Sequence, residues 1–107
     1  MNVITNNNIK CTIALAALES VMDPEIGLNV ADLGLIYQID FNESEKKIYV
    51  TMTLTTQFCP MGKSITDAVK QVLETVFAGE EVMLALSFEP PWNQERISED
   101  GKQFLNK

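Results

Sequence analysis

The most constraining feature of this sequence is an alternating segment followed closely by an amphipathic one. In residues 48–55, apolar side chains alternate with Thr and Tyr, the two-residue period of a half-buried strand. A helix is predicted over residues 60–78, because Pro60 favours the first position of a helix. Cys59, just before it, is then the candidate N-cap. The apolar side chains of this helix recur at helical spacing and must face a core: Ile65, Ala68, Val69, Val72, Leu73 and Val76.

Similar patterns predict a helix over residues 9–22, strands over 35–41 and 82–88, and a last helix over 99–105 capped by Ser98. The fold class is therefore α+β in two layers, in the order α-β-β-α-β-α. We expect helices on one face of a small three-stranded sheet, with 35–41 and 48–55 as antiparallel neighbours. The other face carries Thr51 and Thr53, so it is either partly polar or covered by a terminal segment or a second subunit.

Length and charge narrow the function classes. The 107 residues suit one domain, which we place at 9–107 after a flexible N-terminus at 1–8. A net charge of −7 and the lack of a basic run disfavour binding to nucleic acid or to anionic membranes. There is neither an apolar run of membrane-spanning length nor a signal-peptide pattern, so we expect a cytoplasmic protein.

The chain has no histidine, which removes the commonest general base and the commonest nitrogen ligand for metals. Mechanisms that pair Cys or Ser with His within one chain are excluded. Of the two cysteines, Cys11 is expected to be a small core or surface thiol. Cys59 is the candidate for chemistry, because the partial positive charge at a helix start favours the reactive thiolate.

Three acids and one aromatic residue each have two interpretations. Asp23 and Glu25 flank Pro24, either as turn residues or as carboxylates presented on a rigid turn to a metal or a protein surface. Asp32 is either a solvated loop acid or a polar member of a site at the end of the sheet. Trp92 is expected to be a packing anchor for the C-terminal segment, with partner binding as the alternative.

Four stretches, in matching order and spacing, resemble the metal–sulfur cluster biosynthetic family, which includes SufT-like and PaaD-like iron–sulfur assembly proteins. They are Asp23-Pro24-Glu25, the segment 32–37 that begins Asp32-Leu33-Gly34, the segment 52–60 that ends in Cys59-Pro60, and Pro90-Pro91-Trp92. The resemblance covers nearly the whole predicted domain. It implies a role in maturing iron–sulfur proteins by helping to deliver clusters to client apoproteins.

The resemblance also implies a site. Cys59 would be the functional thiol and a possible transient ligand of iron or of a cluster, supported by Thr55, Thr56 and the three acids Asp23, Glu25 and Asp32. The family's usual proline is Gln57 here, and a Cys-rich C-terminal extension is missing, which favours a SufT-like over a PaaD-like protein. One cysteine cannot complete a four-thiolate shell, so we expect no permanent cofactor.

The partners implied are iron–sulfur assembly proteins and client apoproteins, with a homodimer as one way to complete the shell. Two other functions remain open. The chain could be an enzyme with Cys59 as a nucleophile activated by the helix end, or a non-catalytic adaptor that binds partners through Trp92. A non-enzymatic assembly factor is the favoured interpretation.

Overall fold

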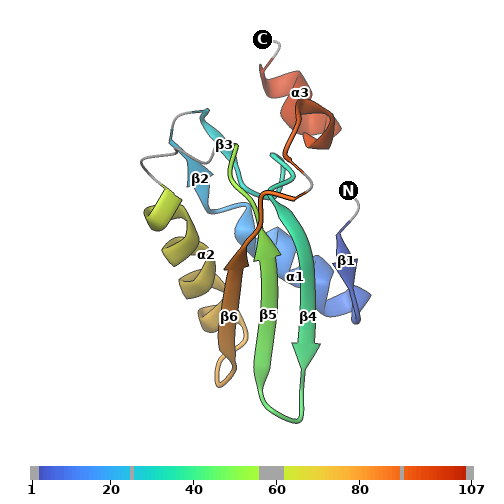
Figure 1. The fold of residues 1–107 in the computed structure, drawn as a ribbon, viewed down its shortest axis with the longest axis vertical. Helices are drawn as coiled ribbons and strands as arrows, with labels where there is room; N and C mark the ends of the chain where they lie inside the picture. Colours follow the sequence, from blue (N-terminus) through green and yellow to red (C-terminus); the bar gives the residue numbers. More distant parts are fainter. Residues whose placement is uncertain (1–2, 25, 56–61, 90, 106–107) are drawn as a thin grey trace.

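The computed structural model describes residues 3–24, 26–55, 62–89 and 91–105. The chain folds into one larger sheet, one small hairpin and three α-helices within these ranges (Figure 1). The elements in chain order are β1 Ile4–Thr5, α1 Asn8–Leu18, β2 Met22–Asp23, β3 Leu28–Asn29, β4 Ile36–Asn42, β5 Lys47–Met52, α2 Gly62–Val76, β6 Glu81–Leu86, the 3-10 turn η1 Gln94–Arg96 and α3 Glu99–Leu105.

The larger sheet has the strand order β1-β4-β5-β6. The antiparallel pairing of β4 with β5 confirms the predicted hairpin, and β6 runs parallel to β5 after the α2 crossover. The sheet has one strand more than predicted, because Ile4–Thr5 pairs in parallel with β4. This short strand lies in the segment that the sequence assigned to a flexible N-terminus. Its alternation is too brief to be recognised without the neighbouring strand.

The first helix is shorter than predicted. It ends at Leu18, and the N–H groups of the next residues tighten the last turn by donating to carbonyls three positions back. Val21 and Met22 then enter the β2–β3 hairpin, where the Val21 carbonyl accepts from the N–H of Val30 at 2.9 Å. Met22, the last residue of the predicted helix 9–22, therefore belongs to β2, and it is half exposed.

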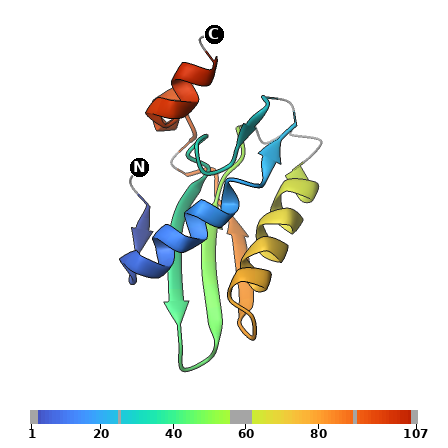
Figure 2. The same cartoon turned by 180° about the vertical axis from the view of Figure 1, so that it is seen from behind.

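Helices α1 and α2 lie on the same face of the sheet, which confirms the two-layer α+β arrangement (Figures 1 and 2). Helix α3 lies beyond the end of the sheet and does not cover this face (Figure 1). The core between the layers takes its fully buried aliphatic side chains from both layers, including Leu18, Ile39, Ile48, Val50, Val69, Leu73 and Val82. Val76, predicted on the buried stripe of α2, is 43% exposed at the last turn.

One register shift changes the faces of β4. The ladder pairs Ile36 with Met52 and Gln38 with Thr51, so an irregularity lies between Ile36 and Gln38. Ile36 is therefore fully buried, although strict alternation places it on the polar face. Tyr37 is buried as well. Alternation in the sequence does not reveal such a bulge.

The second face of the sheet is polar along its middle and covered near one end. Its middle presents Gln38, Asp40 and Tyr49. Toward the end of β5, Thr53 is fully buried, and the C-terminal segment crosses the sheet there (Figure 1). The face is thus partly polar in its middle and covered by a terminal segment near one end, so each of these two expected alternatives holds in one place. Within the described ranges, no helix is both long and apolar enough to cross a membrane.

Candidate functional site

The predicted site residues belong to connections at one end of the sheet. The β2–β3 hairpin, the end of β5 and the start of α2 gather there, opposite the turn between β4 and β5 (Figure 1). Beyond the last ladder pair, the N–H of Thr53 still donates to the carbonyl of Leu35 at 2.8 Å. The backbone therefore holds the start of the β5–α2 connection to the segment that follows Asp32.

The two ends of the β5–α2 connection are in contact. Leu54 is buried, and a Cβ on Gly62, the first residue of α2, would lie 2.7 Å from a methyl carbon of Leu54. Glycine at this position allows the helix start to approach the strand end closely. Thr55 follows Leu54 and is partly exposed, whereas Thr56 and Cys59 lie outside the described residues. The two ends of the stretch that contains the motif are thus anchored together.

Asp23 takes the turn role that was one of its two interpretations. Its carboxylate Oδ1 accepts from the N–H of Ile26 at 3.4 Å, and its carbonyl accepts from the N–H of Gly27 at 2.7 Å. Gly27 adopts a φ of +80°, the left-handed conformation that glycine reaches without strain. Asp23 is 1% exposed, so its carboxylate is buried at this turn. Glu25, its predicted companion, lies outside the described residues.

A groove of about 290 Å³ lies between the turn that contains Pro24 and helix α2. One wall comes from the end of α1 and the β2 turn, with Met22 and Pro24, and the other from the first turns of α2, with Ile65, Ala68 and Val72. It opens beside the helix whose start follows Cys59 in the chain. The groove therefore offers apolar surface next to the anchored connection.

Asp32 ties the loop before β4 to the C-terminal segment. Its carboxylate accepts from the Asn29 amide at 2.7 Å through Oδ2 and from the Ser98 hydroxyl at 2.8 Å through Oδ1. Its carbonyl accepts from the N–H of Ser98 at 2.7 Å. The Ser98 hydroxyl also accepts from the N–H of Gly101 at 3.0 Å, which confirms Ser98 as the cap of α3. Each Asp32 oxygen is thus used in holding chain segments together.

The two residues after Asp32 hold the rest of this segment. The Leu33 carbonyl accepts from the Trp92 indole N–H at 2.7 Å, and the Gly34 carbonyl accepts from Arg96 Nε at 2.9 Å. Trp92 packs partly buried against the core, so the packing-anchor prediction is confirmed. We call the set Asp32, Leu33, Gly34, Trp92, Arg96 and Ser98 the C-terminal clamp.

Arg96 is the member of the clamp that the sequence did not single out. Its guanidinium carbon lies 4.2 Å from the centre of the Tyr37 ring, in addition to the bond to Gly34. An arginine between Glu95 and Ile97 gives no sequence signal for such a contact.

Cys11 is a core residue. It is 5% exposed and unbridged, on the buried side of α1 with Ala14 and Leu18. Burial raises the pKa of its thiol, and a hydrogen bond to Thr5 opposes this change. A neutral thiol in an apolar core is neither a good nucleophile nor a good ligand, so the predicted structural role is confirmed.

The described residues do not form a metal centre by themselves. Across 3–24, 26–55, 62–89 and 91–105, no three side chains of His, Cys, Asp or Glu gather closely enough to hold an ion. Cys59 and Glu25 lie outside these ranges. With Cys11 in the core, Cys59 is the one remaining thiol of the chain. A conventional four-thiolate cluster would therefore need thiols from another molecule.

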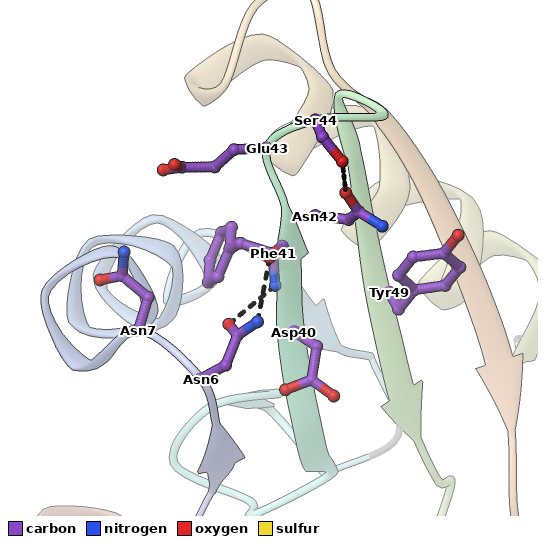
Figure 3. A pocket seen from close by; sticks show the side chains of 8 residues that line it. All are labelled: Asn6, Asn7, Asp40, Phe41, Asn42, Glu43, Ser44 and Tyr49. Carbon is purple, nitrogen blue, oxygen red and sulfur yellow. Dashed lines mark hydrogen bonds between the residues drawn. The ribbon is translucent and has the colours of Figure 1, made fainter.

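A larger pocket, of about 610 Å³, lies at the opposite end of the sheet (Figure 3). Polar side chains of the N-terminal segment and the β4–β5 hairpin line it. Several of these polar groups bond to one another: Asn6 bonds both backbone groups of Phe41, and the Ser44 hydroxyl donates to Asn42 at 2.8 Å. These bonds stabilise the hairpin and the N-terminal strand. Of the predicted site residues that the structure describes, Asp23, Asp32 and Thr55, none lines this pocket.

The described parts of all four motif regions thus lie at one end of a small α+β sheet. Residues 13–84 match the family model described as iron–sulfur cluster assembly protein. The chain belongs to this family. The match begins inside α1 and ends inside β6, so it includes β2 to β5, the β5–α2 connection and α2.

Individual relatives agree with the family. The chain is 43% identical over 84 residues to an Fe-S protein maturation auxiliary factor of Porphyromonas gingivalis, covering 78% of this chain and 79% of the relative. It is 37% identical over 82 residues to the Fe-S protein maturation auxiliary factor SufT of Staphylococcus aureus, covering 77% and 92%. A domain of unknown function from Bacillus anthracis has the same fold, with a TM-score of 0.82, 36% identity, and coverage of 89% and 90%.

Proposed function

We propose that this protein is a maturation factor for iron–sulfur proteins that acts through the thiol of Cys59. The observation that carries the proposal is membership of the iron–sulfur cluster assembly family together with the position of Cys59 in the chain. Cys59 lies in the stretch whose ends, Leu54 and Gly62, are held in contact at the motif-bearing end of the sheet. An anchored stretch between a strand and a helix suits a residue that must be presented repeatedly in one place.

The cluster is cargo in this proposal. Cys11 is buried in the core, which leaves Cys59 as the one other thiol of the chain, so a cluster held here takes its other ligands from an assembly protein or from the client. Shared ligation favours transfer, because each ligand exchange replaces one thiolate with another. Thr55 and Thr56 would donate hydrogen bonds to the bound sulfur and tune it.

The acids have separable roles in this proposal. Asp23 orients the turn that forms one wall of the apolar groove, and Asp32 holds the C-terminal clamp. Both shape the end of the sheet without binding the cargo. Carboxylate oxygens are hard ligands and suit a metal–sulfur unit poorly, which agrees with a supporting role. The partners are therefore assembly proteins that load the thiol and apoproteins that unload it.

The test compares Cys59→Ser with Cys11→Ala in cells that lack the wild-type chain. We expect Cys59→Ser to lower the activity of iron–sulfur enzymes while the variant remains folded, and Cys11→Ala to leave these activities unchanged. Iron and sulfide are then measured on both proteins after anaerobic purification with an assembly partner. Equal enzyme activities in the two strains would reject the proposal.

A further inference from the structure

The two edges of the four-stranded sheet are protected to different degrees. At the β1 edge the strand has two residues, and the Asn6 side chain continues the ladder beyond it. The Asn6 amide accepts from the N–H of Phe41 at 2.9 Å and donates to the Phe41 carbonyl at 3.0 Å (Figure 3). The side chain thus takes the place of a strand residue and satisfies the edge of β4.

The β6 edge is open over half its length. The N–H of Glu81 donates to the carbonyl of Lys46, just before β5, and the N–H of Ser87 donates to the carbonyl of Met52, both at 2.9 Å. By alternation, Val82, Leu84 and Leu86 therefore direct their backbone groups away from the sheet. Glu74 Oε2 accepts from the N–H of Val82 at 3.2 Å. Among the described residues, no acceptor meets the N–H of Leu84 or Leu86.

Exposed apolar side chains surround the open half. Met83 is 43% exposed and Leu86 is 46% exposed, and they point to opposite faces of the strand. Unpaired backbone groups flanked by apolar side chains can pair with a strand of another molecule. Edge strands that do not bind another strand are commonly protected by charged side chains. Here Glu74 accepts only from the N–H of Val82, in the first half of β6.

A second copy of this chain is a poor occupant. A symmetric antiparallel pair centred on Leu84 would join Leu86 of one copy to Val82 of the other, but Glu74 already takes the N–H of Val82. The β6 region also carries Glu80, Glu81 and Glu89 and no basic residue from 80 to 89. Two copies would bring these like charges together at the paired edges, which is unfavourable.

We propose that β6 accepts one short extended segment of a partner protein as an additional strand. Pairing with Leu84 and Leu86 supplies the backbone bonds, apolar side chains at alternate positions pack beside Leu86, and Lys or Arg at the flanks face Glu81 and Glu89. The open half is the half nearest the site, because Leu86 pairs with Met52, shortly before Thr55. That the partner is an assembly or client protein rests on the proposed function; the strand addition does not.

The experiment is an NMR titration of the full chain with a capped peptide of alternating Val and Lys. We expect the amide signals of Leu84 and Leu86 to shift and their hydrogen exchange to slow. A matched peptide with Asp in place of Lys should bind at least about fivefold more weakly, as expected for losing several exposed charge pairs. Shifts confined to β1 or to the α1–α2 side, or equal binding of the Asp peptide, would overturn the proposal.

Three variants locate the contact. Leu86→Pro removes an N–H that points away from the sheet and leaves every hydrogen bond to β5 intact, so it should abolish the peptide-induced shifts of the Leu84 amide signal. Leu86→Ala keeps this N–H and loses one exposed apolar contact, so it should weaken peptide binding only about threefold. Glu89→Lys leaves the strand intact and should also weaken binding. If Leu86→Pro fails to fold, the other two decide, and unchanged affinity in both contradicts the proposal.

Two further results separate the alternatives. Slow exchange at Leu84 and Leu86 without peptide, together with a doubled mass at high protein concentration, would show that a second copy takes this edge and would reject the partner strand. Cys59→Ser should bind the peptide as tightly as the wild type, because the strand does not use the thiol. Peptide binding and iron–sulfur enzyme activity therefore fail independently.

Discussion

The C-terminal clamp and the β5–α2 connection lie at the same end of the sheet, but the side chains of their motifs are used differently. In the clamp, carbonyls and a carboxylate from residues 32–34 accept from Trp92, Arg96 and Ser98 at 2.7 to 2.9 Å. Every motif atom named there contributes to holding two segments together. In the connection, the structure fixes the two ends at Leu54 and Gly62, and the motif thiol belongs to neither.

The difference teaches that a family motif need not mark a functional site. Asp32 was expected to be either a solvated loop acid or a polar member of a site at the end of the sheet, and its carboxylate accepts from Asn29 and Ser98. If this division is correct, changes in the clamp lower stability, and changes in the connection lower function at constant stability. The predictions below test that division, beginning with the largest expected loss of stability.

Gly34→Ala should be the most damaging small substitution in the clamp. Gly34 has a φ of +73°, and an added Cβ would lie 2.3 Å from the carbonyl oxygen of Arg96. The left-handed backbone and the clash with main-chain atoms together should cost about 3 kcal/mol in the free energy of unfolding. Urea denaturation measures this loss.

Gly27→Ala is the matched control for Gly34→Ala. Gly27 also has a positive φ, of +80°, but no atom lies within 4 Å of the added Cβ. Its cost should be that of the backbone conformation alone, about 1 kcal/mol. Equal losses for the two variants would show that the contact with Arg96 contributes nothing.

Trp92→Ala should come next, with a loss of about 2 kcal/mol from removing a half-buried ring and leaving the Leu33 carbonyl without its donor. Trp92→Phe keeps most of the ring and removes the N–H, so it should lose about 1 kcal/mol. Hydrogen exchange should also speed up in α3 more than in α2. An adaptor role for Trp92 without a packing role predicts no change in stability for either variant.

Much of this fold follows from the sequence, because long segments with one clear period fix their own faces. Helix α2 and the β4–β5 hairpin are of this kind. Three features were out of reach. The two-residue strand Ile4–Thr5 shows no period, the bulge before Gln38 is invisible to alternation, and the end of α1 depends on the pairing of Val21 with Val30. Each depends on a partner distant in the chain.

The candidate site divides in the same way. Cys11 as a core thiol, Asp23 as a turn residue, Trp92 as an anchor and Ser98 as a cap could all be predicted, because each role is set by neighbours in the sequence or by apolar character. The use of Asp32 in the clamp could not, because its partner Ser98 is 66 positions away. The roles proposed for Cys59, Thr56 and Glu25 stay predictions from the motif.

Ser98→Ala tests the smallest structural bond of the clamp. The hydroxyl donates to Asp32 and accepts from the N–H of Gly101, so its loss should cost about 1 kcal/mol, as for other helix caps. Ser20→Ala is the control, since the exposed Ser20 hydroxyl bonds only the nearby Ala17 carbonyl. If Ser98→Ala loses no more stability than Ser20→Ala, the Asp32–Ser98 hydrogen bond does not stabilise the fold. Asp32 would then be a candidate for a direct role in the site.

Cys59→Ser should change stability least, by no more than about 0.5 kcal/mol, because the sequence predicts Cys59 as a helix N-cap, a position that serine also favours. The variant keeps Cys11 as its only thiol, and this thiol is buried. Burial raises the Cys11 pKa above its ordinary value of 9.0, so the native variant should resist alkylation by iodoacetamide at pH 8 and react fully in urea. Because the native state favours the protonated thiol, its stabilising effect should be present below pH 9.0 and decline as the pH rises through the higher folded pKa. Adding Cys11→Ala should remove this decline, which thermal melts from pH 7 to pH 11 would detect. Rapid alkylation of native Cys59→Ser at pH 8 would mean that Cys11 is accessible, and the chain would then have a second thiol available to a cluster.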